Sequence, residues 1–78
     1  MNLAVYGING RNYLLLERLK SNDGDEYLYF QSENNGEYLI RKVDINNRGF
    51  IIPLENDLEV VKAINLLINK EELNQIGR

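Results

Sequence analysis

Short stretches rich in Tyr, Leu, Ile and Val alternate, along the first two-thirds of the chain, with residue pairs typical of tight turns. These pairs are Asn9-Gly10, Asp23-Gly24, Asn35-Gly36 and Arg48-Gly49. Asn, Asp and Gly tolerate the positive φ that such turns require. The intervening stretches have the length and composition of strands. They predict five strands, over about residues 3–6, 12–20, 26–31, 37–45 and 50–52.

After Pro53 the spacing of apolar residues changes from period two to about 3.6, which indicates a helix. Asn56 is expected to cap this helix, with Glu59 reaching back as in a capping box, so the helix should cover about residues 57–72. Strands connected by short turns usually pair in sequence order. The predicted fold class is therefore α+β, an antiparallel five-stranded meander followed by one C-terminal α-helix packed on one sheet face.

The chain has 78 residues, of which 44% are hydrophobic and 27% are charged, and this favours one small folded domain over residues 1–78. Its net charge of −3 disfavours direct binding to nucleic acid or to an anionic membrane. The apolar runs are too short to span a bilayer, and the first residues lack the layout of a signal peptide. We therefore expect a cytoplasmic protein.

Histidine, cysteine, threonine and tryptophan are all absent from the sequence. Most nucleophiles and the usual neutral-pH proton carrier are therefore missing, so we expect no enzyme and no catalytic residue. The acids around Gly24 are explained by a hairpin turn and lack the spacing of a calcium loop. We expect neither a metal nor a cofactor.

Strand alternation gives the predicted sheet two apolar faces, and a single helix can cover only one of them. One face is aliphatic with Phe: Leu14, Leu16, Leu28, Phe30, Leu39, Val43, Phe50 and Ile52. The other is rich in Tyr: Tyr13, Leu15, Leu19, Tyr27, Tyr29, Tyr38, Ile40 and Ile51. We expect the helix on the face with Phe, and the face with Tyr as a contact surface. The alternative is that strong coiling of the sheet covers both faces.

The helix is expected to dock through one broad apolar face, while Leu66 and Leu73 lie outside it and could join the rim of an interface. The residues of that docking face are Val60, Val61, Ala63, Ile64, Leu67 and Ile68. The candidate partner-binding residues on the sheet are Tyr13, Tyr27, Tyr29, Tyr38, Ile40, Arg41 and Lys42. An alternative site is an acidic pole, where the turn at Asn35-Gly36 and the helix entry would meet: Glu33, Glu37, Glu55, Asp57 and Glu59.

Three segments of the chain resemble the YrzB-like family of small uncharacterised Gram-positive bacterial proteins. They are Gly10-Arg11-Asn12-Tyr13-Leu14-Leu15-Leu16, Glu26-Tyr27-Leu28-Tyr29-Phe30 and Ile52-Pro53-Leu54-Glu55, the last followed by an acidic helix start. The resemblance implies no functional residues, because that family has none assigned.

These patterns predict a small non-enzymatic module that binds another protein, whose identity the sequence leaves open. Its role would be that of a stoichiometric regulator or a phage-borne inhibitor of a host defence enzyme, similar in kind to an anti-CRISPR protein. Two alternatives stay open. The acidic pole could mimic nucleic acid, or the protein could be a structural homodimer joined through the tyrosine face or an edge strand.

Overall fold

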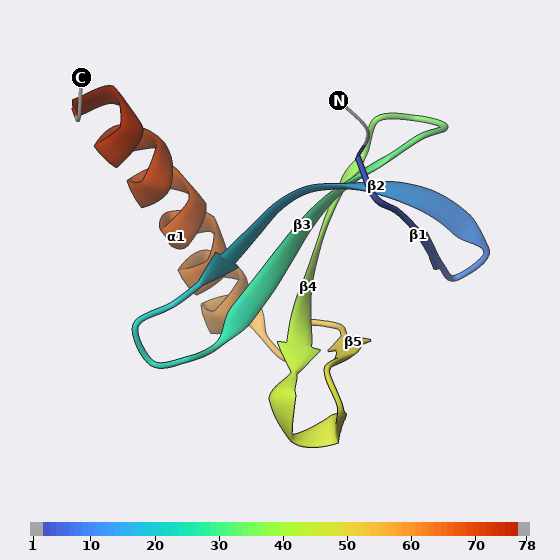
Figure 1. Ribbon diagram of the computed structural model, residues 1–78, viewed down its shortest axis with the longest axis horizontal. Coiled ribbons are helices and arrows are strands. Elements are labelled where there is room, and N and C mark those ends of the chain that lie inside the picture. Colours follow the sequence, from blue (N-terminus) through green and yellow to red (C-terminus); the bar gives the residue numbers. More distant parts are fainter. Residues whose placement is uncertain (1–2, 77–78) are drawn as a thin grey trace.

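The computed structural model describes the backbone of residues 3–76 and the side chains of residues 3–70. Its strands are β1 (Val5–Ile8), β2 (Arg11–Lys20), β3 (Glu26–Ser32), β4 (Tyr38–Asp44) and β5 (Phe50–Ile52). A short 3-10 helix, η1 (Ile45–Asn47), joins β4 to β5, and the helix α1 (Asp57–Ile76) follows. The strands pair antiparallel in the order β1-β2-β3-β4-β5 (Figure 1). The predicted α+β meander with one C-terminal helix is confirmed.

The turns between the strands use the residue pairs that the sequence singles out. Asn9 and Gly10 both have positive φ, at 53° and 78°, which is the backbone of a tight two-residue hairpin. Arg48 and Gly49 also have positive φ, at 56° and 74°, and they end η1 and lead into β5. The local chemistry of these pairs therefore places the strand ends.

The cap of α1 forms as the sequence predicts. Asn56 Oδ1 accepts a hydrogen bond of 3.0 Å from the Glu59 main-chain N–H, and the Glu59 carboxylate accepts one of 2.8 Å from the Glu55 N–H. The first bond satisfies a main-chain donor that the first turn of a helix leaves free. The second ties Glu59 to the residue before the cap rather than to Asn56 itself. The helix then continues beyond the predicted end at residue 72, to Ile76.

A β-bulge in the middle of β2 changes which residues share a sheet face. Leu15 pairs with Phe30, but the next pair along is Glu17 with Tyr29, so Leu16 is an extra residue with no partner opposite. Such a residue reverses the alternation of the strand beyond it. Tyr13 and Leu15 therefore share the face of Phe30, and the predicted placement of both on the tyrosine face is wrong.

The pairing of β4 with β5 corrects the predicted faces at the other end of the sheet. Ile51 pairs with Val43 and so lies on the Phe30 face, whereas Ile52 pairs with Lys42 on the opposite face. The prediction had these two isoleucines on the opposite sides. The register between β4 and β5 is set by their connection, which contains η1. The alternation of residues within one strand does not determine that register.

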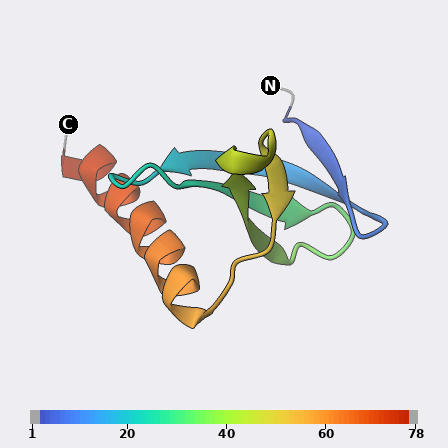
Figure 2. The same ribbon diagram turned by 90° about the horizontal axis from the view of Figure 1, so that it is seen from below.

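The sheet itself covers the Phe30 face by bending (Figure 2). Phe30 is fully buried and makes T-shaped ring contacts with Tyr6 and Tyr13, at centroid distances of 5.3 and 6.3 Å. Tyr6 from β1 also lines a cavity of about 320 Å³ together with Ile51 of β5, so the two outer strands approach each other across this face. The coiling that the sequence left as an alternative is present.

The helix packs on the opposite face of the sheet, which carries Tyr27 and Tyr29. Both tyrosines are buried, and Ala63 of α1 lies fully buried against them. The expectation that α1 covers the face with Phe30 is therefore wrong. A small residue at the crossing lets the helix approach two broad rings closely, while the bend of the sheet already covers Phe30. Five half-buried residues complete this core: Leu19, Ile40, Leu54, Leu66 and Leu67.

Candidate functional site

The junction between α1 and β3 contains two buried tyrosines with different hydrogen bonding. Tyr29 Oη donates a hydrogen bond of 2.7 Å to the Ala63 carbonyl oxygen. The Tyr27 hydroxyl is buried and has no hydrogen-bond partner among the described residues. Burial raises the pKa of Tyr29 to about 12 and also raises the pKa of Tyr27. Neither hydroxyl is suited to proton transfer at neutral pH.

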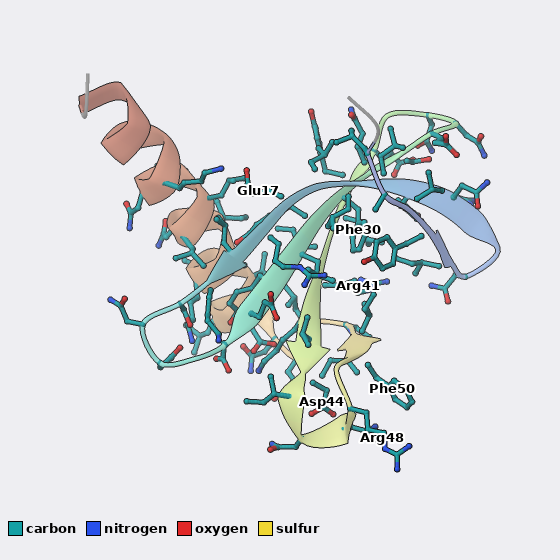
Figure 3. The ribbon with its side chains drawn as sticks, viewed as in Figure 1. Glu17, Phe30, Arg41, Asp44, Arg48 and Phe50 are labelled. Atoms are coloured by element: carbon teal, nitrogen blue, oxygen red, sulfur yellow. The ribbon has the colours of Figure 1, made fainter. Side chains whose placement is uncertain are left out.

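An ion-pair network surrounds Tyr27 and ties the helix to the sheet. Lys62 Nζ lies 2.6 Å from a carboxylate oxygen of Asp23 and 2.9 Å from one of Asp25. Lys42 Nζ lies 2.7 Å from Glu59 and 3.9 Å from Asp25. Asp25 therefore links two lysines that come from α1 and β4. A further ion pair joins Lys70 of α1 to Glu17 of β2 (Figure 3).

The electrostatics of this ion-pair network favour a structural role. The hydrogen bond from Lys62 lowers the pKa of the Asp23 carboxyl to about 2, and the same bond raises the pKa of Lys62. The hydrogen bond between Lys42 and Glu59 lowers the pKa of Glu59 and raises that of Lys42. These four groups stay charged at neutral pH, so they hold the helix in place and neither gain nor lose a proton there.

The tyrosine contact surface expected from the sequence does not form. Tyr27, Tyr29 and Ile40 lie under α1, and Lys42 is held by Glu59. Tyr13 and Arg41 lie on the opposite face, because Tyr13 precedes the bulge and Arg41 pairs with Leu28. Of the seven candidates, Tyr38 alone is largely exposed, at 74%. The structure therefore scatters the proposed contact residues over both faces and the interior.

The predicted acidic pole is also divided. Glu33 and Glu37 flank the turn between β3 and β4, where Glu37 is held by Asn35. Glu59 is paired with Lys42, and Figures 1 and 2 both place the start of α1 far from that turn. The physical reason is the shortness of β5. This strand has 3 residues, so the chain leaves the sheet before it has run back along β4 to the turn between β3 and β4. The remaining members, Glu55 and Asp57, are exposed at the helix entry.

The outer face of α1 is apolar and exposed. Four side chains form this outer stripe: Leu58, Val61, Ile64 and Ile68. Leu58 is 82% exposed and Val61 is 53% exposed. The helix is therefore rolled relative to the prediction, which had Val61, Ile64 and Ile68 facing the sheet. Leu66, expected at an interface rim, instead packs in the core. The side chain of Leu73 lies outside the described residues.

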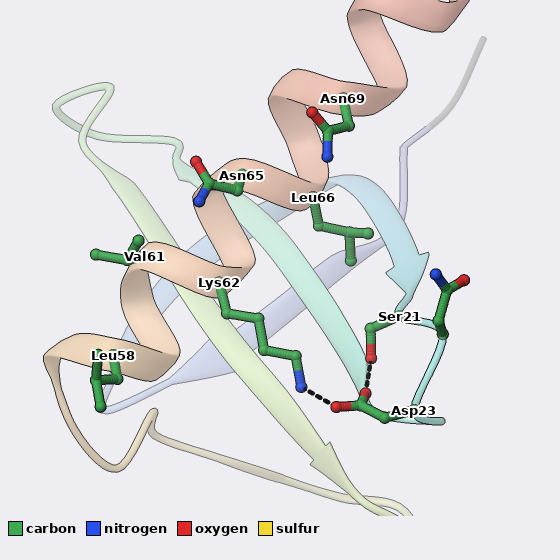
Figure 4. Close-up of a pocket in the computed structure, with 9 residues that line it drawn as sticks. Ser21, Asp23, Leu58, Val61, Lys62, Asn65, Leu66 and Asn69 are labelled. Atoms are coloured by element: carbon green, nitrogen blue, oxygen red, sulfur yellow. Dashed lines mark hydrogen bonds and ion pairs between the residues drawn. The ribbon is translucent and has the colours of Figure 1, made fainter.

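A groove runs beside the outer stripe, between α1 and the turn that joins β2 to β3 (Figure 4). We call it the turn groove; its volume is about 560 Å³. Ser21, Asn22 and Asp23 of the turn line one side of it. The helix side carries three apolar and three polar residues: Leu58, Val61, Leu66, Lys62, Asn65 and Asn69. Lys62 reaches across to Asp23, and Ser21 also donates a hydrogen bond to Asp23.

Two other surface features lie apart from the turn groove. A cleft of about 390 Å³ opens beside the bulge and is lined by Leu16, Tyr38 and Leu67 among others. The exposed Ile45 begins η1 and the exposed Phe50 begins β5, and Phe50 points away from α1 (Figure 3).

The spacing of apolar residues in the sequence also indicates the outer stripe, although the predicted docking face included most of its members. Leu58, Val61 and Ile68 follow spacings of three and seven residues, which places them on one side of a helix. Leu66 and Leu67 belong to a different side, so α1 is apolar on two sides. The predicted docking face treats α1 as apolar on one side only and therefore combines residues of both sides.

The fold and the site together define a small α+β protein with an apolar helix face beside a groove. No protein-family model, no curated protein and no solved structure matches the chain. The resemblance to the YrzB-like family stays a prediction. In the described part of the chain, no cluster of three or more acidic, His or Cys side chains could hold a metal ion. The helix that the structure describes is not long and apolar enough to cross a membrane.

Proposed function

We propose that this protein is a non-enzymatic, cytoplasmic module that binds another protein stoichiometrically, with the outer face of α1 as its contact surface. The outer stripe carries the proposal. Its four large apolar side chains remain exposed on one helix, although the same chain buries Tyr27, Tyr29 and Phe30. Contiguous apolar patches of this kind on soluble proteins are typical of interaction sites.

The charge distribution on α1 supports a contact surface. The outer stripe contains no charged side chain between Leu58 and Ile68, because Lys62 turns toward the β2–β3 turn and pairs with Asp23 and Asp25. The cores of protein interfaces are depleted in charge in the same way. Polar groups instead lie at the side of the stripe, in the turn groove, as they do at the rim of an interface.

A regulatory role fits such a surface. A stoichiometric regulator, including a phage-borne inhibitor of a host defence enzyme, acts by covering a site on its partner, so a rigid binding face is sufficient. The ion pairs of Lys42, Lys62 and Lys70 hold α1 against the sheet and keep that face in one orientation. Preorganised surfaces of this kind lose less conformational entropy on binding.

The test is affinity capture from a host lysate with three forms of the full chain. Val61→Lys places a charge in the outer stripe, one turn from Asp57, where a favourable pair keeps the helix folded. Tyr38→Lys changes an exposed residue on the sheet and serves as the matched control. We expect a partner that wild type and the Tyr38 variant retain in equal amounts and that the Val61 variant loses. Retention of the partner by the Val61 variant, or capture of nothing stoichiometric by wild type, would contradict the proposal.

Binding to a different protein must also be distinguished from self-association through the same helix face. Sedimentation of the pure protein at high concentration should show a monomer. The acids Glu55 and Asp57 lie at one end of α1, and the sequence carries Glu71 and Glu72 toward the other end. Parallel or antiparallel pairing of two copies along this helix would therefore bring like charges together. If wild type is a dimer and the Val61 variant is a monomer, the outer stripe binds a second copy of this chain and not the proposed partner.

A further inference from the structure

We propose that the turn groove binds a segment of the partner in an extended conformation, with Asn65 and Asn69 hydrogen-bonded to its main chain. This inference rests on the proposed function and specifies the chemistry of the partner. The segment would carry a basic side chain together with apolar side chains at alternate positions.

The two asparagines have unused hydrogen-bonding capacity. Both are exposed, both line the turn groove, and neither side chain is hydrogen-bonded to any group in the described part of the chain. Figure 4 shows the two side chains on successive turns of α1, with the Asn65 amide on the side of the helix that carries Val61. Each amide offers a carbonyl acceptor and an NH₂ donor, so each can pair with one N–H and one C=O group of a peptide.

The spacing of the asparagines matches an extended chain. Residues four apart on a helix are separated by about 6 Å along its axis. The two-residue repeat of an extended chain is about 6.6 Å, and its equivalent main-chain groups point to the same side at that interval. A helical occupant would present few free main-chain groups, because its own hydrogen bonds use them. The pair of amides therefore favours an extended segment.

The apolar residues of the groove supply sites for alternate side chains. Leu58 and Val61 are exposed on the helix, and Leu66 lies toward the turn that carries Ser21 (Figure 4). In an extended segment, every second side chain points the same way. Main-chain bonds to the two amides would thus leave alternate side chains to pack on these apolar groups, as in other peptide-recognition grooves.

The charges of the groove favour a basic segment. Lys62 is the one cation among the described lining residues and pairs with Asp23 and Asp25. Asp25 also lies 3.9 Å from Lys42, which pairs with Glu59, so three carboxylates face two lysines here. Asp57 and Glu55 add exposed negative charge at the helix entry beside Leu58. The local balance is negative, so a Lys or Arg side chain would find complementary charge at this end of the groove.

The first experiment needs no natural partner. A library of short random linear peptides is displayed and selected on the full wild-type chain. We expect the enriched peptides to carry Lys or Arg with apolar residues at alternate positions. A library that yields no binder, or binders without a basic residue, would overturn the inference.

A synthetic peptide from that selection then tests the two amides. Asn65→Ala with Asn69→Ala should weaken its binding about tenfold or more, because two main-chain hydrogen bonds are lost. Alanine is a better helix former than asparagine, so α1 stays folded. The matched control, Asn46→Ala with Asn47→Ala in η1, should bind as wild type does. Equal binding by both double variants would contradict the role of the amides.

N-methylation of single peptide bonds provides a readout of main-chain contact. Methylation at the two alternate positions that meet the amides should weaken binding, while methylation at the intervening position should have little effect. A peptide that binds as a helix, seen by its circular dichroism in the complex, would overturn the inference. A natural partner that is lost with Val61→Lys but kept by the Asn65 and Asn69 double variant would leave the proposed function standing and refute the groove occupant alone.

Discussion

The Tyr29 hydroxyl donates a hydrogen bond of 2.7 Å to the Ala63 carbonyl oxygen and so joins the central strand β3 directly to α1. Ala63 is fully buried at this crossing. The bond fixes the roll of the helix about its own axis, because it requires one particular side of α1 to face the sheet. The side opposite to Ala63 is then the one that presents the outer stripe to solvent.

Removing the two buried hydroxyl groups should have opposite consequences. Tyr29→Phe should lower the free energy of unfolding by about 0.5–1.5 kcal/mol, because a made hydrogen bond is lost. Tyr27→Phe should leave stability unchanged or raise it by about 1 kcal/mol, because an unpartnered buried hydroxyl is removed. Urea denaturation of both variants measures the difference. Equal destabilisation by the two substitutions would contradict this account of the junction.

Acid should weaken the attachment of α1 through the ion-pair network. The pKa values of Asp23 and Glu59 are lowered in the folded protein, so their contribution to stability is complete above the ordinary values of 3.8 and 4.5 and is lost as the pH falls below these values. In an NMR titration, the Asp23 carboxyl should have a pKa of about 2 in wild type and one closer to 3.8 in Lys62→Met. Lys70→Met, which removes the separate pair with Glu17, should leave the pKa of Asp23 unchanged.

Alkali should unfold the protein through the buried tyrosines. The pKa of Tyr29 is raised to about 12 by burial, so its contribution to stability is complete below pH 10 and is lost as the pH rises from 10 through 12. The ultraviolet absorbance of tyrosinate should therefore increase in this range together with the loss of secondary structure. In Tyr29→Phe, unfolding should depend less steeply on pH there. An unchanged pH dependence in that variant would show that Tyr29 ionises without unfolding.

The extra residue in β2 should be required for the fold. Deleting Leu16 would remove the bulge, so either Tyr13 and Leu15 or Glu17 and Leu19 would turn to the wrong sheet face. We expect the deletion to abolish cooperative thermal unfolding. Leu16→Ala keeps the bulge and removes only a partly exposed side chain, so it should cost about 1 kcal/mol or less. A deletion variant as stable as Leu16→Ala would show that the register can slip without penalty.

Much of this protein follows from local chemistry that a sequence displays. The pairs Asn9-Gly10 and Arg48-Gly49 adopt the positive φ that their residue types favour, and Asn56 with Glu59 forms the cap that begins α1. Strand order follows because short turns join neighbouring strands. Each of these features depends on residues that are close in sequence, so the meander and its helix could be predicted.

The choice between faces depends on contacts between residues that are distant in sequence. Both sheet faces are apolar and α1 is apolar on two sides, so local patterns leave more than one way to pack them. The unpaired Leu16 reverses half of β2, the bend of the sheet covers Phe30, and the bond from Tyr29 to Ala63 sets the roll of the helix. Only the tertiary structure decided which apolar residues stayed exposed, because that outcome requires all of these contacts at once.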